Sequence, residues 1–196
     1  MGAPFFWSAL MGGMEHSFET SDWVPFPVEL VFAFFANPNN LPPLMPRWQR
    51  ARIEHVDVMA TPPRPAPAPG RPRLLSIAAG EGTTTLISFR LLPYFPFRLT
   101  WDARITQFAW NDSFCDEQVR GPFATWLHCH TVTTEMRDGT EGTTVLDGVT
   151  YSLPGGSVGD ALNAVIVRNE VRKLFRHRQQ RLHEILPAAA RQAGLA

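Results

Sequence analysis

The chain has 196 residues and a mass of 22.0 kDa, which suits one domain, and 44% of its residues are hydrophobic while 18% are charged. This composition supplies a sizeable core and excludes intrinsic disorder for most of the chain. Basic and acidic residues number 18 each, so the net charge is zero, which argues against a nucleic-acid-binding protein. Two cysteines are too few to staple a secreted fold, and we expect a cytoplasmic protein without a cofactor.

Both ends of the chain are expected to lie outside the folded body. Residues 1–14 form an apolar leader, either unstructured or packed on the body or on a second copy, because its three aromatic residues would need a cover. No apolar run reaches the length of about 18 residues that predicts a membrane span. A single domain is expected over residues 15–187, followed by a tail at 188–196.

The first part of the chain predicts two strands with helices between them. A strand is expected over residues 15–24. A helix then begins at Pro27, where proline suits the first turn, and ends at 37–38. A second short helix at 40–46 is a weaker prediction because it contains three prolines, and a strand with alternating pattern follows over 48–58.

A proline-rich segment interrupts this order. Residues 60–73 contain six prolines and one glycine, which favours an exposed loop because proline cannot donate to a sheet or a helix. Short connections and β-favouring residues then predict an antiparallel meander. Its strands are expected over residues 74–79, 83–92, 97–108, 112–120, 125–136 and 143–152.

A long amphipathic helix ends the domain. It begins at Ser157, after a Pro-Gly-Gly break, and its helical pattern continues to Leu186. The stripe expected to face the sheet comprises Val158, Ala161, Leu162, Val165, Ile166, Val171, Leu174, Phe175, Leu182 and Ile185. The order of elements predicts an α+β fold in which a curved antiparallel sheet of six to seven strands wraps around this helix and leaves space for a ligand.

Two turns fix which side chains share a face of the sheet. A turn at 121–123 pairs Asp116 with His128 and Phe114 with His130, and the Asp138-Gly139 turn continues this register into the next strand. Because residues two apart on a strand share a face, a polar and aromatic group is expected there, and a slip of one residue would scatter it. Its members are Asp116, Gln118, Trp126, His128, His130, Asp147 and Tyr151.

Three interpretations of this face remain open: polar pairs on a half-wet surface, a pocket that orients an apolar ligand, and a metal or acid–base site. His128 or His130 suits proton transfer, with Asp116 or Asp147 to orient it. No metal is expected, since His-x-His on a strand lacks a third ligand at a fixed spacing. The two cysteines, residues 115 and 129, pair on the opposite face, where free thiols are expected and a disulfide is the alternative.

The motif from Asp116 through His128 and His130, with Asp147-x-Val149-x-Tyr151-x-Leu153-Pro154 ahead of the long helix, resembles the START-like, or SRPBCC, superfamily. The closer likeness is to its bacterial polyketide-cyclase/dehydrase-like and ligand-binding members, and it covers about residues 15–186. The resemblance implies a helix-grip fold around a hydrophobic cavity. That family includes lipid carriers, hormone receptors and aromatase/cyclases, and has no universal catalytic residues. The proline-rich loop departs from its usual short strand connection.

We therefore expect a domain that binds a hydrophobic small molecule, such as a lipid, a polyketide or an aromatic compound, as a monomer or homodimer. The alternatives are a cyclase or dehydratase that uses a His/Asp acid–base pair, and a protein-interaction module that uses the N-terminal aromatics and the proline-rich loop. The expected ligand-binding residues are Phe32, Phe35, Phe89, Trp101, Gln118, Trp126, His128, His130, Tyr151, Leu162, Ile166 and Phe175.

Overall fold

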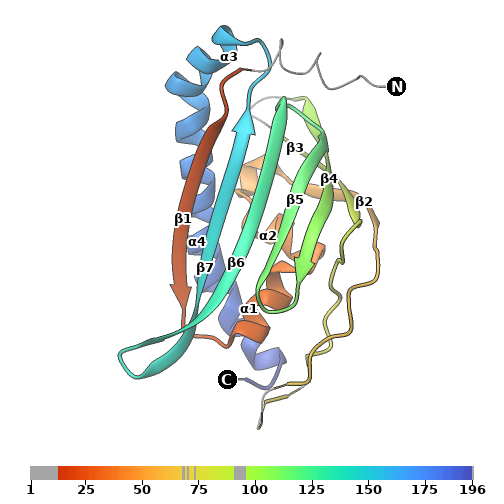
Figure 1. The fold of residues 1–196 in the computed structure, drawn as a ribbon, viewed down its shortest axis with the longest axis vertical. Coiled ribbons are helices and arrows are strands. Elements are labelled where there is room, and N and C mark those ends of the chain that lie inside the picture. The colour runs from red at the N-terminus through yellow and green to blue at the C-terminus, as the bar shows by residue number, and fades with distance from the viewer. Residues whose placement is uncertain (1–12, 68, 70, 73, 91–95, 196) are drawn as a thin grey trace, which may run out of the picture.

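A computed structural model describes residues 13–67, 69, 71–72, 74–90 and 96–195, so residues 1–12 of the expected leader lie outside the described residues. Seven antiparallel strands form one sheet in the order β1-β7-β6-β5-β4-β3-β2 (Figure 1). The strands are β1 (His16–Val24), β2 (Arg52–Asp57), β3 (Thr84–Arg90), β4 (Arg98–Ala109), β5 (Ser113–Arg120), β6 (Thr125–Arg137) and β7 (Thr140–Ser152). The expected sheet of six to seven strands around a long C-terminal helix is confirmed.

The helices lie on one side of this sheet, with α4 running behind β1 and β7 in Figure 1. The two short ones are α1 (Val28–Phe35) and α2 (Leu41–Leu44), so the weakly predicted second helix does form despite its prolines. The C-terminal helix is continuous through α3 (Ser157–Leu162), a π-helical turn (Asn163–Val167) and α4 (Arg168–Gln192). In the part of the chain that the structure describes, no helix has both the length and the apolar character that a membrane crossing needs.

The C-terminal helix extends past the expected boundary at Leu186 to Gln192, so most of the expected tail is helical. Pro187 lies inside this last part and removes one backbone hydrogen bond. Leu186 and Ala190 are nevertheless fully buried, at 0% exposure, and their burial stabilises the helix on both sides of the proline.

The core consists of two clusters of buried side chains. The first gathers α1, α2, the middle of the sheet and the end of α4: Val24, Val31, Phe32, Phe34, Ala36, Leu44, Phe114, Val132, Val145, Leu182 and Leu186. The second lies nearer the beginning of α4: Trp126, Val149, Tyr151, Val171 and Phe175. The polar group expected from the sequence belongs to the same face of the sheet as both clusters.

The strand expected over 74–79 is wrong. Leu75 and Ile77 are 94% and 58% exposed, so these two side chains do not pack on the sheet, and only the end of the segment, at Ala78 and Ala79, reaches the core. Its carbonyl groups are engaged elsewhere, because the Arg64 guanidinium donates to the carbonyl oxygens of Leu74 and Ser76 at 3.0 and 3.1 Å. A side chain of the proline-rich loop thus takes the place that a neighbouring strand would fill.

The inward position expected for the first turns of the C-terminal helix is also wrong. Four apolar side chains of the expected stripe point outward, at 48–75% exposure: Val158, Leu162, Val165 and Ile166. Ala161 is exposed as well. The line of buried positions that continues back from Val171 passes instead through Asn163 and Gly159.

Two contacts fix that rotation of the helix. The Tyr151 hydroxyl donates to Asn163 Oδ1 at 2.7 Å within the core. A Cβ at Gly159 would lie 2.5 Å from the Pro154 carbonyl oxygen, so the helix approaches the preceding loop more closely than a larger residue would allow. Asn163 and Gly159 therefore hold the inward positions of these turns, although the hydrophobic pattern predicts apolar residues there.

The two cysteines form a disulfide, so the expectation of free thiols is wrong. Cys115 and Cys129 lie directly opposite each other on β5 and β6, with their Cα atoms 4.0 Å apart. They are on the face of the sheet away from the helices, as the register predicted.

Candidate functional site

The predicted registers of the two hairpins are confirmed. Strands β5 and β6 pair Phe114 with His130 and Asp116 with His128. Strands β6 and β7 pair His130 with Asp147 across the turn at 138–139, where Asp138 and Gly139 have φ of 50° and 76°. Left-handed values at both positions are typical of the two-residue hairpin turn whose twist matches the strands.

Gln118 departs from the expected arrangement. The ladder between β5 and β6 ends at Glu117 and Leu127, so Gln118 has no partner in register on β6. Its side chain instead closes the turn, with Nε2 donating to the Phe123 carbonyl oxygen at 2.8 Å and Oε1 accepting from the Phe123 amide at 3.3 Å. These bonds hold Phe123, which faces the interior beside Trp126 and Tyr151.

Four polar side chains form a connected chain on the inner face, which we call the acid–histidine cluster: Asp116, His128, Asp147 and His130. His128 lies between the two carboxylates, with Nδ1 3.5 Å from Asp116 Oδ2 and Nε2 3.0 Å from Asp147 Oδ1. His130 Nδ1 lies 2.7 Å from that same Asp147 oxygen. Both imidazoles and Asp147 are buried, whereas the Asp116 side chain is 24% exposed.

The surroundings of the cluster shift the pKa values of its members in different directions. Burial lowers the pKa of His128, but the hydrogen bonds and charges of Asp116 and Asp147 more than offset this, and its pKa is raised. Burial, and then the charge of His128, lowers the pKa of His130 to about 4. The two imidazoles hold the pKa of Asp147 well below its usual value although burial opposes this. The two carboxylates therefore favour the protonated form of His128, whereas His130 beside it is held in the neutral form.

Aromatic rings enclose the acid–histidine cluster and join the two core clusters. The His130 ring lies 4.6 Å from Phe114, a member of the first cluster, and 4.8 Å from Phe35, which packs against that cluster. The His128 ring lies 5.3 Å edge-on from Phe175, which belongs to the second. The imidazoles thus stand where the two hydrophobic clusters meet, in surroundings that strengthen their interaction with the carboxylates.

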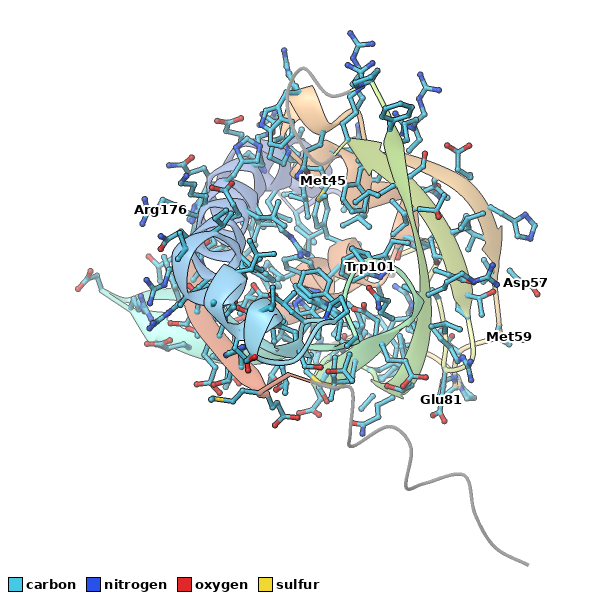
Figure 2. The ribbon with its side chains drawn as sticks, turned by 90° about the horizontal axis from the view of Figure 1, so that it is seen from above. Met45, Asp57, Met59, Glu81, Trp101 and Arg176 are labelled. Carbon is cyan, nitrogen blue, oxygen red and sulfur yellow. A yellow bond between two sulfur atoms is a disulfide. The ribbon has the colours of Figure 1, made fainter. Side chains whose placement is uncertain are left out.

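The structure brings four of the twelve expected ligand-binding residues together in one aromatic group: Phe89, Trp101, Trp126 and Tyr151. Trp101, which lies between the C-terminal helix and strands β3 and β4 in Figure 2, contacts Phe89, Trp126 and Phe123 at ring-centroid distances of 6.2, 5.1 and 5.6 Å. Tyr151 lies 5.7 Å from Trp126 in the same group.

Three of the expected ligand-binding residues lie elsewhere. Phe32 is buried in the first core cluster, against Phe108 and Phe114. Leu162 and Ile166 are exposed on the outer side of the C-terminal helix, away from this aromatic group.

Sequence reasoning missed three inward-facing residues of the site. The sequence places Phe123 in a turn, and the signal for an inward position is its aromatic side chain close to Trp126 in the chain. Ile105 pairs with Asp116 across β4 and β5. Bulges shift the register of this ladder, so counting residues from the turn does not predict the pair. Asn163 lay within an apolar run, where a polar residue gave no sign that Tyr151 would meet it.

Two hollows of the described surface lie away from the space between the sheet and α4. A small one of about 30 Å³ adjoins the proline-rich loop at Arg64, Pro65 and Arg71. One of about 380 Å³ is lined by residues of β2 to β5, among them Leu86 and Asp102. Neither lies between the sheet and α4, so the internal cavity stays a prediction.

Three of the buried groups have the chemistry of metal ligands. His128, His130 and Asp147 each offer one ligand atom, and these atoms lie within 4.8 Å of one another. A metal would require both imidazoles to be neutral at the coordinating nitrogen, whereas the two carboxylates favour the protonated form of His128. The expectation of no metal stays a prediction, tested below.

No family model and no curated protein matches the sequence. Solved structures do match. Ara h 8.0201 has a TM-score of 0.57 at 14% identity, over 89% of this chain and 99% of that one. TTHA0849 from Thermus thermophilus has a TM-score of 0.57 at 15% identity, with the same coverage. Norcoclaurine synthase from Thalictrum flavum, in complex with dopamine and hydroxybenzaldehyde, has a TM-score of 0.55 at 10% identity, over 94% of each chain. At these identities the likeness concerns the fold, and the expected helix-grip fold is confirmed.

Proposed function

We propose that the chain binds a hydrophobic small molecule between the sheet and α4, with the acid–histidine cluster orienting its polar end. The observation that carries the proposal is the partial exposure of Asp116. Its carboxylate is 24% exposed although it is on the inner face of the sheet, while His128 behind it is 5% exposed. An accessible carboxylate backed by a buried imidazolium is a suitable hydrogen-bond acceptor for a ligand hydroxyl.

The surroundings of Asp116 supply the apolar part of such a site. Ile105 opposite it, and Trp101 and Phe123 further along, are all half-buried although they belong to the inner face. Apolar side chains that remain accessible on an inner face offer area for a ligand to bury. At about 25 cal/mol per Å², burial of 300 Å² of ligand contributes about 7 kcal/mol before association costs. The ligand class that fits is a lipid, polyketide or aromatic compound with at least one hydroxyl.

A substitution that fills the interior tests the proposal. Ala103 lies on β4, two residues from both Trp101 and Ile105, in register with Thr85 and Gln118. We expect Ala103→Trp to abolish binding of a fluorescent apolar probe, anilinonaphthalene sulfonate, at a stability cost of about 1–3 kcal/mol. Ala109→Trp, at an exposed position of the same strand, is the matched control. Equal probe binding by the wild type and Ala103→Trp would contradict the proposal, and native mass spectrometry of the purified protein would identify a co-purified ligand.

The second candidate function is an enzyme of the cyclase or dehydratase kind. The observation that favours it is the chain of proton-holding groups, in which the imidazolium of His128 contacts the accessible Asp116 on one side and Asp147 on the other. A proton from His128 would leave toward the ligand through Asp116, with Asp147 holding the ring in place.

The variant Asp116→Asn separates the two functions. A carrier should lose about 1–2 kcal/mol of binding free energy, which is the scale of one orienting hydrogen bond. An enzyme should bind nearly as before and lose about 10²–10⁴-fold in turnover. The measurement is calorimetric titration of the identified ligand together with mass-spectrometric detection of its conversion; unchanged binding and unchanged turnover would contradict both roles.

A further inference from the structure

The outer side of the C-terminal helix begins with an exposed apolar stripe. Its members, at 75%, 48%, 72% and 50% exposure, are Val158, Leu162, Val165 and Ile166. They lie at helical spacing and so form one surface on the first turns of the helix. The opposite side of these turns faces the body through Gly159 and Asn163. Contiguous exposed apolar surface, unlike a single exposed residue, is typical of an interaction site.

Basic side chains continue the same side of the helix. Counted from Val165, they follow at seven, eight and eleven residues, which are spacings that share a helix face: Arg172, Lys173 and Arg176. All three are exposed, and Figure 2 shows Arg176 at the outer edge of the helix. The apolar stripe therefore passes directly into a basic surface.

The acidic side chains of these turns already have partners. Asp160 Oδ1 accepts a hydrogen bond from the Met14 amide at 2.8 Å and lies 3.4 Å from His16 Nε2. Glu170 accepts from Lys173 Nζ at 2.8 Å. Between positions 157 and 176 the only other charged residues are three arginines, at 168, 172 and 176, so four basic side chains stand against two acidic ones. This part of the helix carries excess positive charge although the whole chain is neutral.

We propose that this side of the helix docks on a membrane surface that contains anionic lipids. The apolar stripe would enter the interface, and the basic side chains would contact the headgroups. Apolar side chains beside basic ones on an exposed helix are typical of segments that lie in the membrane interface. The positive charge selects anionic lipids, since each basic residue near such a surface is attracted to it. The inference does not depend on the ligand-binding function and concerns a different surface.

The size of the stripe favours this occupant over a second copy of the chain. A stable interface between two proteins buries about 800 Å² on each partner, from about 20–30 residues a side. Four apolar side chains on one helix fall well short of that. A membrane surface adapts to the shape of the helix, so a short stripe is sufficient where neighbouring basic residues add electrostatic attraction.

Flotation with lipid vesicles tests the docking in the full chain. We expect the wild type to bind vesicles of phosphatidylcholine and phosphatidylglycerol about tenfold more tightly than vesicles of phosphatidylcholine alone. Added salt should weaken this binding, because it screens the charge of the headgroups. Failure to bind the mixed vesicles would overturn the proposal, and so would equal binding to both kinds of vesicle.

The variant Val158→Ser/Val165→Ser assigns the apolar contact. Both positions are exposed, so the fold should be kept, which circular dichroism checks. We expect binding to the mixed vesicles to fall about fivefold or more, because less apolar area enters the interface. Leu75→Ser/Ile77→Ser, at exposed apolar positions outside the helix, is the matched control and should bind as the wild type does. A wild-type dimer in sedimentation velocity that this variant loses would assign the stripe to a second copy and overturn the proposal.

The variant Arg172→Gln/Arg176→Gln assigns the electrostatic contact. We expect a loss of about fivefold or more on the mixed vesicles and little change on phosphatidylcholine alone. Arg52→Gln/Arg104→Gln removes the same charge from exposed positions of β2 and β4 and should leave vesicle binding unchanged. Binding that survives in either helix variant would place the membrane contact on another part of the chain and overturn the proposal.

Discussion

His128 and His130 lie two residues apart on one strand, yet their pKa values move in opposite directions. His128 has a carboxylate on each side, whereas His130 shares Asp147 with it and feels its positive charge. The pKa of His128 is raised and that of His130 is lowered to about 4. Two histidines on the same face of a sheet thus have pKa values shifted in opposite directions, because both are buried but Asp116 lies close only to His128.

The lowered pKa of His130 predicts a loss of stability in mild acid. Its native pKa is about 4, whereas the unfolded chain binds a proton there near pH 6.5. Between these values the unfolded state holds the extra proton, so the free energy of unfolding falls as pH falls, by about 3 kcal/mol in total from this site. His128 acts in the reverse direction: its raised pKa contributes stability that is present below about pH 6.5 and is lost as pH rises through the native value.

The variant His130→Gln should show a flatter stability profile between pH 6.5 and 4 than the wild type. Glutamine keeps a hydrogen-bond donor toward Asp147 but takes up no proton, which removes the acid-side loss from this position. Urea unfolding followed at intervals of pH gives the profile. His55→Gln, at an exposed histidine, is the control and should keep the slope of the wild type. A His130→Gln profile as steep as that of the wild type would show that the acid sensitivity lies elsewhere.

Elemental analysis tests whether the acid–histidine cluster holds a metal. We expect no stoichiometric zinc or iron in the purified protein, because the raised pKa of His128 favours the imidazolium, which has no free nitrogen lone pair to coordinate a metal. Adding Zn²⁺ at neutral pH should leave the melting temperature unchanged, since a bound ion would stabilise the native state. One equivalent of metal that disappears in His128→Ala would refute this expectation.

At the scale of the elements, the disulfide between β5 and β6 joins two strands that already pair. Cys115 and Cys129 are 14 positions apart, and closing a loop of about this length stabilises a fold by about 3 kcal/mol in the chain-entropy account. The variant Cys115→Ser/Cys129→Ser should therefore lose about 2–3 kcal/mol of unfolding free energy and keep its circular dichroism spectrum.

Two measurements check the prediction about the disulfide. Alkylation of the unfolded wild type without reductant should modify neither Cys115 nor Cys129, and urea unfolding gives the stability difference. The wild type after full reduction is the control and should match the double variant. Complete alkylation without reductant would mean that the thiols are free, as the sequence pattern alone had indicated.

The hairpins were predictable in detail and the rotation of the C-terminal helix was not, for a physical reason. Asp138 and Gly139 fix the pairing of β6 with β7 through local backbone conformation, which two residues suffice to specify. The rotation of the helix depends on the Tyr151–Asn163 hydrogen bond and on the close approach at Gly159, which join segments that meet only in three dimensions. Hydrophobic periodicity alone therefore predicted the wrong face of the helix, because the stripe that it assigned to the core is exposed.

The expected strand at 74–79 failed for the same kind of reason. Its run of apolar residues suggested a strand, but a strand needs a partner in register, and Arg64 from the proline-rich loop binds the carbonyl groups of this segment instead. The acid–histidine cluster, by contrast, follows from register alone, so its members could be named from the sequence. The pKa shifts of its histidines could not be predicted from the sequence, because they depend on burial by Phe35, Phe114 and Phe175.

At the scale of the whole molecule, the two core clusters meet at the acid–histidine cluster, with Phe175 of α4 at the junction. The Phe175 ring lies 5.2 Å from Phe18 of β1 and 5.3 Å from the His128 ring of β6. The side chain therefore holds the helix to both the edge and the middle of the sheet. Since the clusters share this contact, we expect the domain to unfold in one cooperative transition rather than in two.

The variant Phe175→Ala tests this view of the molecule. Phe175 is 1% exposed, and truncation of a buried phenylalanine leaves a cavity that costs about 3–5 kcal/mol. We expect a loss of this size in the free energy of unfolding, with tryptophan fluorescence and far-ultraviolet circular dichroism still changing at the same urea concentration. Leu75→Ala, at a position that is 94% exposed, is the control and should change stability by less than about 0.5 kcal/mol. If fluorescence instead changed before circular dichroism in the wild type, the two clusters would unfold separately, and the grip of the sheet on α4 would depend on the first cluster alone.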